Sequence, residues 1–188
     1  MGDVFTPQRT QISVERFQKM VATGVITPQD RIELIDGEMI DMAPIGGPHA
    51  WAVMRLATQL IRILGDRNIV WVQSPVVLSD RSQPQPDLCV LRHRDEGYGK
   101  ALPSAGDVLL LVEVADTTLS FDRGKKLDLY AKQRIPEYWI VNLTDKRLEL
   151  YRKPGPAGYA VELALEAGQD AALALLPDVV VRVSEVLG

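Results

Sequence analysis

One stretch of this chain, Val108 to Val112, is apolar at every position. A short continuous apolar run is typical of a strand that is covered on both faces of its sheet. A helical pattern follows from about Arg123 to Gln133, and Tyr138 to Asn142 then resembles another central strand. Strands mixed with a few helices, with one helix between two apolar strands, favour a mixed α/β sheet with helices packed on it.

The other segments fit this layout. Ser13 is a suitable N-cap for a first helix, and Asp36-Gly37 is a favoured two-residue hairpin turn. A long helix carries a broad apolar stripe of Ala50, Met54, Ala57, Ile61 and Leu64, with Val53 and Leu60. The expected elements are helices at 14–22 and 48–64, N-terminal hairpin strands at 31–36 and 38–42, strands at 69–78 and 88–91, C-terminal edge hairpin strands at 147–152 and 159–163, a strand at 179–183 and a helical turn at 184–187.

Length and composition limit the class of protein. The chain has 188 residues, which predicts a single domain over 1–188, and its 46% apolar and 24% charged residues are typical of a globular chain. We expect no membrane span, because no run of about 18 uncharged apolar residues exists. The first ten residues contain no apolar signal segment, so a cytoplasmic location is expected. The single cysteine, Cys89, lies in an apolar stretch and is expected to be a buried small hydrophobe.

The net charge of −4 counts mildly against a nonspecific nucleic-acid binder, which usually has a basic domain. It does not exclude a nuclease, because an acidic metal site lowers the net charge and basic patches can be local. Three such patches are candidates: 92–94, 123–126 and 132–134.

Two acids and a lysine stand out by their positions. Asp87 follows Pro86 at the start of an apolar run, Glu113 directly follows Val108 to Val112, and Lys126 lies at the start of the next helical pattern. Two carboxylates and an ammonium group brought together can hold a divalent metal and position a water beside a phosphodiester. The sequence therefore indicates nuclease chemistry.

Each of these residues has a simpler explanation. Asp87 can be a turn former or a cap, and Glu113 can lie just past the edge of the sheet in solvent. Lys126 can be an ordinary solvated lysine, and its neighbour Lys125 is a rival for the same role. Helical spacing places Lys126 on the side of Tyr130, which is expected to face the core, but periodicity does not decide between the two lysines.

The hairpin offers further acids. In its expected register Ile35 pairs with Glu38, and Glu33 with Ile40, so Glu33 and Glu38 project from one face. Either acid could assist a metal site, although an exposed charged face is the simpler explanation. His49 is expected to touch solvent at the start of a helix, and two histidines without a nearby cysteine do not favour zinc. No glycine-rich nucleotide-binding motif is present, so no organic cofactor is expected.

Several segments resemble the bacterial Uma-type family of restriction endonucleases, which is placed in the PD-(D/E)xK nuclease superfamily. Their order and spacing match from about residue 14 to 187. They are Glu33-Leu34-Ile35-Asp36-Gly37-Glu38, Gln85-Pro86-Asp87, Leu111-Val112-Glu113-Val114, Asp122-Arg123-Gly124-Lys125-Lys126-Leu127-Asp128-Leu129-Tyr130 and Pro136-Glu137-Tyr138-Trp139-Ile140-Val141.

The resemblance implies a restriction-endonuclease-like mixed sheet and a role for each site residue. Asp87 takes the first metal-ligand position and Glu113 the second, and a backbone carbonyl near Val114 completes the protein ligands for Mg²⁺ or Mn²⁺. The superfamily's usual lysine would fall at Ala115, which is not a lysine; the family pattern places it instead at Lys126 on the following helix.

The implied reaction is metal-dependent hydrolysis of a DNA phosphodiester, with Glu33 or Glu38 assisting. One alternative is a module that keeps the fold and binds nucleic acid or a protein partner without cutting. The charge of −4 and the missing lysine at Ala115 favour this alternative somewhat. Another is a homodimer whose main role is assembly, with the apolar-rich hairpins from Arg147 to Leu165 as its interface.

Overall fold

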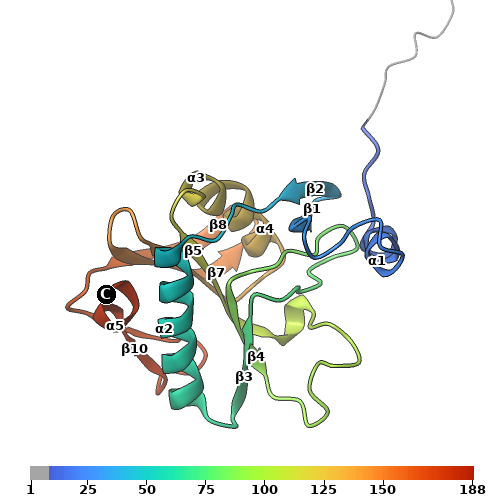
Figure 1. Cartoon of the computed structure of the whole chain (residues 1–188). Helices are drawn as coiled ribbons and strands as arrows, with labels where there is room; N and C mark the ends of the chain where they lie inside the picture. Colours follow the sequence, from blue (N-terminus) through green and yellow to red (C-terminus); the bar gives the residue numbers. More distant parts are fainter. Residues whose placement is uncertain (1–8) are drawn as a thin grey trace, which may run out of the picture.

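The structure is a computed structural model in which residues 9–188 are described. Its centre is a six-stranded sheet in the order β3-β4-β5-β6-β7-β8 (Figure 1). The elements are α1 (Val14–Ala22), β1 (Ile32–Ile35), β2 (Glu38–Asp41), α2 (Gly47–Leu64), β3 (Asn68–Val72), β4 (Leu88–Arg92), the 3-10 turn η1 (Ala105–Asp107), β5 (Val108–Ala115), α3 (Leu119–Phe121), the π-helix η2 (Asp122–Lys126), α4 (Leu127–Lys132), β6 (Glu137–Asn142), β7 (Arg147–Gly155), β8 (Gly158–Leu165), β9 (Asp170–Ala172), β10 (Val180–Arg182) and α5 (Val183–Leu187).

The sheet is mixed, which confirms the predicted fold class. Strands β5 and β6 run parallel, and every other neighbouring pair in this sheet is antiparallel. A parallel pair needs a crossover connection, and α3, η2 and α4 supply it between β5 and β6. The crossover therefore brings this helical segment back over the sheet beside the end of β5.

The sheet has a core on each face. Successive strand residues point to opposite faces, so Leu110 and Val112 of β5 pack with helix α2, whereas Leu111 packs with α4. The α2 side is completed by α5 and by the small β9–β10 sheet, of which only β10 was expected from the sequence. All eight residues of β5 are buried, which confirms the prediction of a strand covered on both faces.

Helix α2 buries part of the expected stripe, namely Val53, Ala57, Leu60 and Leu64. Val53, Leu56 and Leu60 face the sheet, whereas Met54 and Ile61 are exposed. The sheet covers only one side of this helix, and Met54 and Ile61 of the expected stripe lie outside that side. Cys89 is buried in β4 as expected. Within residues 9–188, no helix is both long and apolar enough to cross a membrane.

Several expected elements have different bounds, and two of these differences have a clear local cause. The strand expected at 69–78 ends at Val72, because Gln73 adopts a positive φ of 41° and Pro75 has no amide hydrogen to donate. The helix expected at 123–133 begins earlier, because the amides of Phe121 and Asp122 already donate to the Thr118 carbonyl. It also contains a π-helical segment that its periodicity did not indicate.

The C-terminal hairpin is not a pair of edge strands. β7 pairs with β6 on one side and β8 on the other, so β8 alone forms this edge of the sheet. Leu148 and Leu150 of β7 belong to the main core, and this burial is the physical reason for the internal position.

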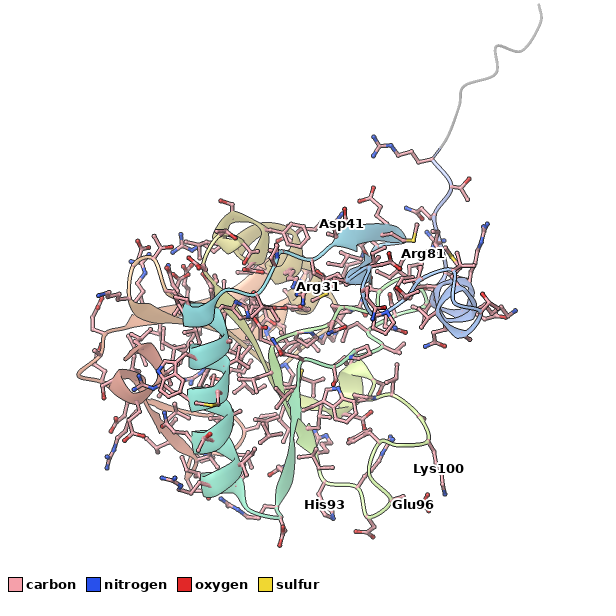
Figure 2. All side chains as sticks on the ribbon, in the orientation of Figure 1. Arg31, Asp41, Arg81, His93, Glu96 and Lys100 are labelled. Atoms are coloured by element: carbon pink, nitrogen blue, oxygen red, sulfur yellow. The ribbon has the colours of Figure 1, made fainter. Side chains whose placement is uncertain are left out.

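One of the expected basic patches lies far from the hairpin acids. His93 and Lys100 lie in the loop after β4, at the opposite end of the molecule from Asp41 of β2 (Figure 2). Arg94 pairs with Asp107 at 3.2 Å, and His93 lies 3.1 Å from Asp95. The 92–94 patch therefore neutralises local acids, and it is not part of a site with the hairpin.

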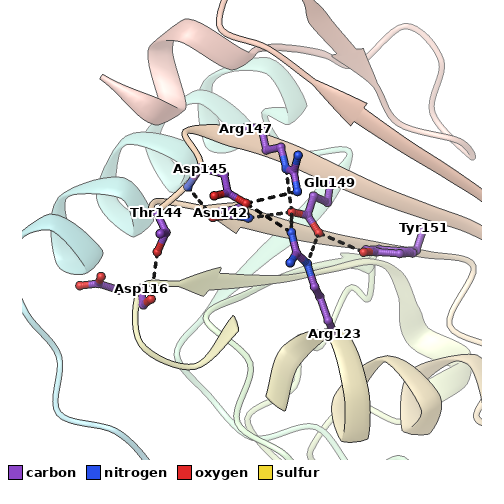
Figure 3. Close-up of polar contacts among 8 residues, drawn as sticks. All are labelled: Asp116, Arg123, Asn142, Thr144, Asp145, Arg147, Glu149 and Tyr151. Carbon is purple, nitrogen blue, oxygen red and sulfur yellow. Dashed lines mark hydrogen bonds and ion pairs between the residues drawn. The ribbon is translucent and has the colours of Figure 1, made fainter. Parts of the chain in front are cut away.

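A buried carboxylate, Glu149, organises a polar cluster where β6 and β7 meet (Figure 3). It accepts hydrogen bonds from Arg123, Asn142, Arg147 and Tyr151. Burial opposes its charge, but these donors together lower the pKa of Glu149 to about 2. The fold therefore holds this side chain ionised.

Glu149 should make the free energy of unfolding depend on pH. A carboxyl whose folded pKa of about 2 lies below its ordinary 4.5 stabilises the fold above pH 4.5, and this contribution disappears as the pH falls towards 2. The shift corresponds to about 3 kcal/mol at neutral pH. In urea titrations, we expect the stability difference between the wild type and Glu149→Gln to fall below about half by pH 3. A difference that stays constant from pH 7 to pH 3 would contradict this assignment.

Candidate active site

The crossover, the hairpin and two sheet strands meet around a cavity of about 630 Å³. Asp87 precedes β4, Glu113 belongs to β5, Glu33 comes from β1, and Lys126 ends η2; all four line the cavity. Glu113 is only 4% exposed and β5 continues past it, so the alternative of a solvated acid beyond the sheet edge is wrong.

Lys126 lies between the acids. Its Nζ is 2.9 Å from Oε1 of Glu113, 3.4 Å from Oε1 of Glu33 and 4.0 Å from Oδ1 of Asp122. Burial alone would lower the pKa of Lys126, but the nearby carboxylates outweigh the effect of burial, and the pKa of Lys126 is raised. The side chain of Lys125 is 32% exposed and pairs with Glu38 outside this group. Of the two lysines, the structure brings Lys126 to the acids.

Glu113 is held at one oxygen and free of protein donors at the other. Tyr130 donates its hydroxyl to Oε1 at 2.6 Å, and Lys126 donates to the same atom. Among residues 9–188, no donor contacts Oε2. Burial raises the pKa of Glu113 to about 8, against the lowering effect of Lys126. The pocket therefore favours the carboxylate most when a further positive charge is nearby.

Asp87 is fixed by three donors. Its Oδ2 accepts from the backbone N–H of Val114 at 2.8 Å, and its Oδ1 accepts from Nε2 of His49 at 2.8 Å and from Gln73 at 3.3 Å. Asp87 thereby raises the pKa of His49, although burial acts in the opposite direction. The hydrogen bond to Val114 ties the start of β4 to the cavity end of β5. Asp87 is thus more than a turn former.

The hairpin acids have separate positions. The observed register pairs Glu33 with Ile40 and Ile35 with Glu38, as the sequence predicted. Glu33 is 3% exposed and accepts from the backbone of Gln85, so an exposed charged face is wrong for this residue. Glu38 is exposed and takes no part in the cavity.

The chain matches the model of a known protein family over most of its length. The model of the family described as "Uma2: Putative restriction endonuclease" matches residues 14–184. The chain belongs to the Uma2 family. No curated protein matches the chain.

Among solved structures, the Uma2 chain is similar to a crystal structure described as a putative nuclease belonging to DUF820 from Anabaena variabilis ATCC 29413. The two share 13% sequence identity, with a TM-score of 0.74, and the match covers 94% of this chain and 97% of the other. At this identity the likeness supports the nuclease-like fold.

Three residues of this Uma2 site were not assigned from the sequence. His49 was expected in solvent, yet its side chain is 17% exposed and bonds to Asp87. Asp122 is 2% exposed, lines the cavity and accepts from the Thr118 hydroxyl at 2.6 Å; burial raises its pKa. Tyr130 was expected to face the core without a role at Glu113. Only the i, i+4 spacing of Asp122 and Lys126 gave a local signal for any of them.

The chemistry of the Uma2 cavity fits a divalent cation with oxygen ligands. Glu113 has an oxygen without a protein donor, and Val114 lines the cavity beside it. Within residues 9–188, however, no three His, Cys, Asp or Glu side chains are grouped as ligands of one metal ion. Mg²⁺ does not require such a group, since it commonly binds one or two carboxylates and keeps several waters. The acidic residues that line the cavity are Glu33, Asp41, Asp87, Glu113, Asp116 and Asp122.

Proposed function

We propose that the chain is a metal-dependent endonuclease that hydrolyses DNA phosphodiester bonds, and that residues 1–188 form one PD-(D/E)xK nuclease-like domain. The observation that carries this proposal is the ammonium group of Lys126, 2.9 Å from Glu113 in the cavity that Asp87 also lines. A lysine from the crossover helix thereby reaches the acids, although Ala115, where the superfamily's lysine would fall, is a buried core residue.

In this proposal Asp87, Glu113 and the backbone carbonyl of Val114 hold Mg²⁺ or Mn²⁺. The bound cation supplies the charge that polarises the phosphate and lowers the pKa of a water. Lys126 orients the attacking water or stabilises negative charge as it develops on the phosphate oxygens. Glu33 assists by keeping the Lys126 ammonium beside the acids, 3.4 Å from its own carboxylate.

The charge of the cavity lining disfavours a phosphate that enters without a cation. The cavity is lined by six acids, against Lys126 and His49, so an unaided phosphate would meet net repulsion. A divalent cation held by Asp87 and Glu113 would offset part of this charge. DNA is therefore expected to enter the site together with the cation or after it.

A metal titration tests this proposal directly. Calorimetry should show Mn²⁺ binding to the wild type that is lost in Asp87→Asn and Glu113→Gln. Binding should be tighter at pH 8.5 than at pH 6.5, because burial raises the pKa of Glu113 to about 8 and the ligand must lose its proton. Asp41→Asn is a matched control, since it removes a carboxylate of the same cavity that is not a proposed ligand. Equal binding by all three variants would argue against the ligand assignment.

A second candidate function is a module that binds nucleic acid or a protein partner without cutting. It is favoured by Ala115 and by the existing hydrogen bonds of Asp87, which occupy both of its oxygens. DNA retardation in gels without any cation binding would support this candidate.

In either case we propose that β8, the edge of the sheet with exposed Leu163, is the contact surface of a homodimer.

A further inference from the structure

The segment that carries Lys126 is the π-helix η2, which lines the cavity and also forms an ion pair with strand β7. The N–H of Leu127 donates to the carbonyl of Asp122, five residues earlier, which widens the turn. Asp122 and Lys126, at its two ends, both line the cavity. Short π-helical turns inside α-helices occur frequently at functional sites.

Arg123 is not among the residues that line the cavity, and it connects this turn to the sheet. Its Nε donates to Oε2 of Glu149 at 2.8 Å, and a second guanidinium nitrogen donates to Oε1, which makes the pair bidentate (Figure 3). The guanidinium also lies 3.6 Å from Asp145. Because Glu149 belongs to β7, this pair connects the π-helix to an internal strand of the sheet.

From this arrangement we infer that Arg123 is a positioning residue for Lys126, an inference that rests on the proposed function. A catalytic lysine on a sheet strand is placed by the strand itself, whereas a lysine on a short helical turn needs the turn to be fixed. Arg123 lies three residues before Lys126, and its ion pair with Glu149 holds the turn in place. Displacement of a catalytic group by about 1 Å can lower the reaction rate on the order of 10²-fold.

The chain offers a matched control for this inference. Arg147 contacts the same two carboxylates, Glu149 at 3.2 Å and Asp145 at 3.2 Å, and its side chain has the same 35% exposure as that of Arg123. It lies on β7, however, and makes no link to the π-helix. Either substitution leaves Glu149 with other donors, including Asn142 and Tyr151, so neither leaves the buried carboxylate unpaired.

Cleavage kinetics separate positioning from simple charge. Arg123→Ala should lower kcat about 10- to 100-fold with little change in KM, whereas Arg147→Ala should change kcat less than about twofold. In a background that carries Lys126→Ala, adding Arg123→Ala should cause no further loss. Equal losses in both arginine variants, or a full extra loss in the double variant, would overturn the inference.

A chemical readout keeps the inference testable without cleavage. Acetic anhydride labelling with mass spectrometry should modify Lys126 faster in Arg123→Ala than in the wild type or Arg147→Ala. Lys132, whose side chain is 70% exposed, is the internal reference. If the wild type does not cut DNA, the proposed function fails, yet faster labelling in Arg123→Ala alone would still support the positioning link. Unchanged labelling of Lys126 would overturn it.

Discussion

DNA cleavage in Mg²⁺ should fall at least about 10³-fold when either Asp87 or Glu113 is replaced by alanine. Both side chains line the one cavity that contains Lys126, and they are its proposed metal ligands. Loss of either removes a ligand charge that water cannot replace. Cleavage of a plasmid should be measured with Mg²⁺, with Mn²⁺ and with excess chelator, where no product is expected from any variant.

Folding must be separated from chemistry in this test. Glu113→Gln retains an oxygen for the Lys126 ammonium and the Tyr130 hydroxyl, so its unfolding in urea should be compared with that of the wild type before its cleavage is interpreted. Asp87→Asn retains an oxygen for the N–H of Val114. Cleavage that persists in both variants or in chelator would indicate a contaminating nuclease and remove the support for this site.

Lys126→Ala should lower kcat by about 10²- to 10³-fold, whereas Lys125→Ala should change it less than about twofold. The two lysines carry the same charge one residue apart, but only Lys126 is buried with the acids; Lys125 pairs with exposed Glu38. Cation affinity should not fall in Lys126→Ala, because the substitution removes a positive charge from among the ligands.

This pair of variants also tests the alternative function. A basic cluster that merely attracts DNA would lose a similar, small part of its DNA affinity in each variant, and mobility shifts at several salt concentrations would show it. Equal small effects on cleavage from both substitutions would favour the non-catalytic module.

Local sequence patterns determined much of the fold. The apolar run at 108–112, the helical pattern after it and the apolar strand at 138–142 predicted a covered mixed sheet, and the structure has one. The Asp36-Gly37 turn fixed the register of the N-terminal hairpin, since a two-residue turn leaves one pairing of its flanking residues. These features depend on neighbouring residues and are therefore visible in the chain.

Strand ends and strand positions that depend on contacts between residues distant in the sequence could not be predicted from the sequence. Val72 ends its strand where Gln73 turns, and β7 becomes internal because both β6 and β8 pair with it. No local pattern distinguishes an edge strand from a strand one position further in when both alternate apolar and polar residues.

The candidate site divides in the same way. Sequence alone selected Asp87, Glu113 and Lys126, because acids beside apolar runs and a lysine in a family pattern are unusual enough to notice. Only the tertiary structure decided between Lys126 and Lys125. It also showed that Glu33 is buried whereas Glu38 is exposed, and that His49 contacts Asp87. These choices depend on which side chains from separate elements share one low-dielectric cavity, where an unpaired charge is costly and each group must find its partner.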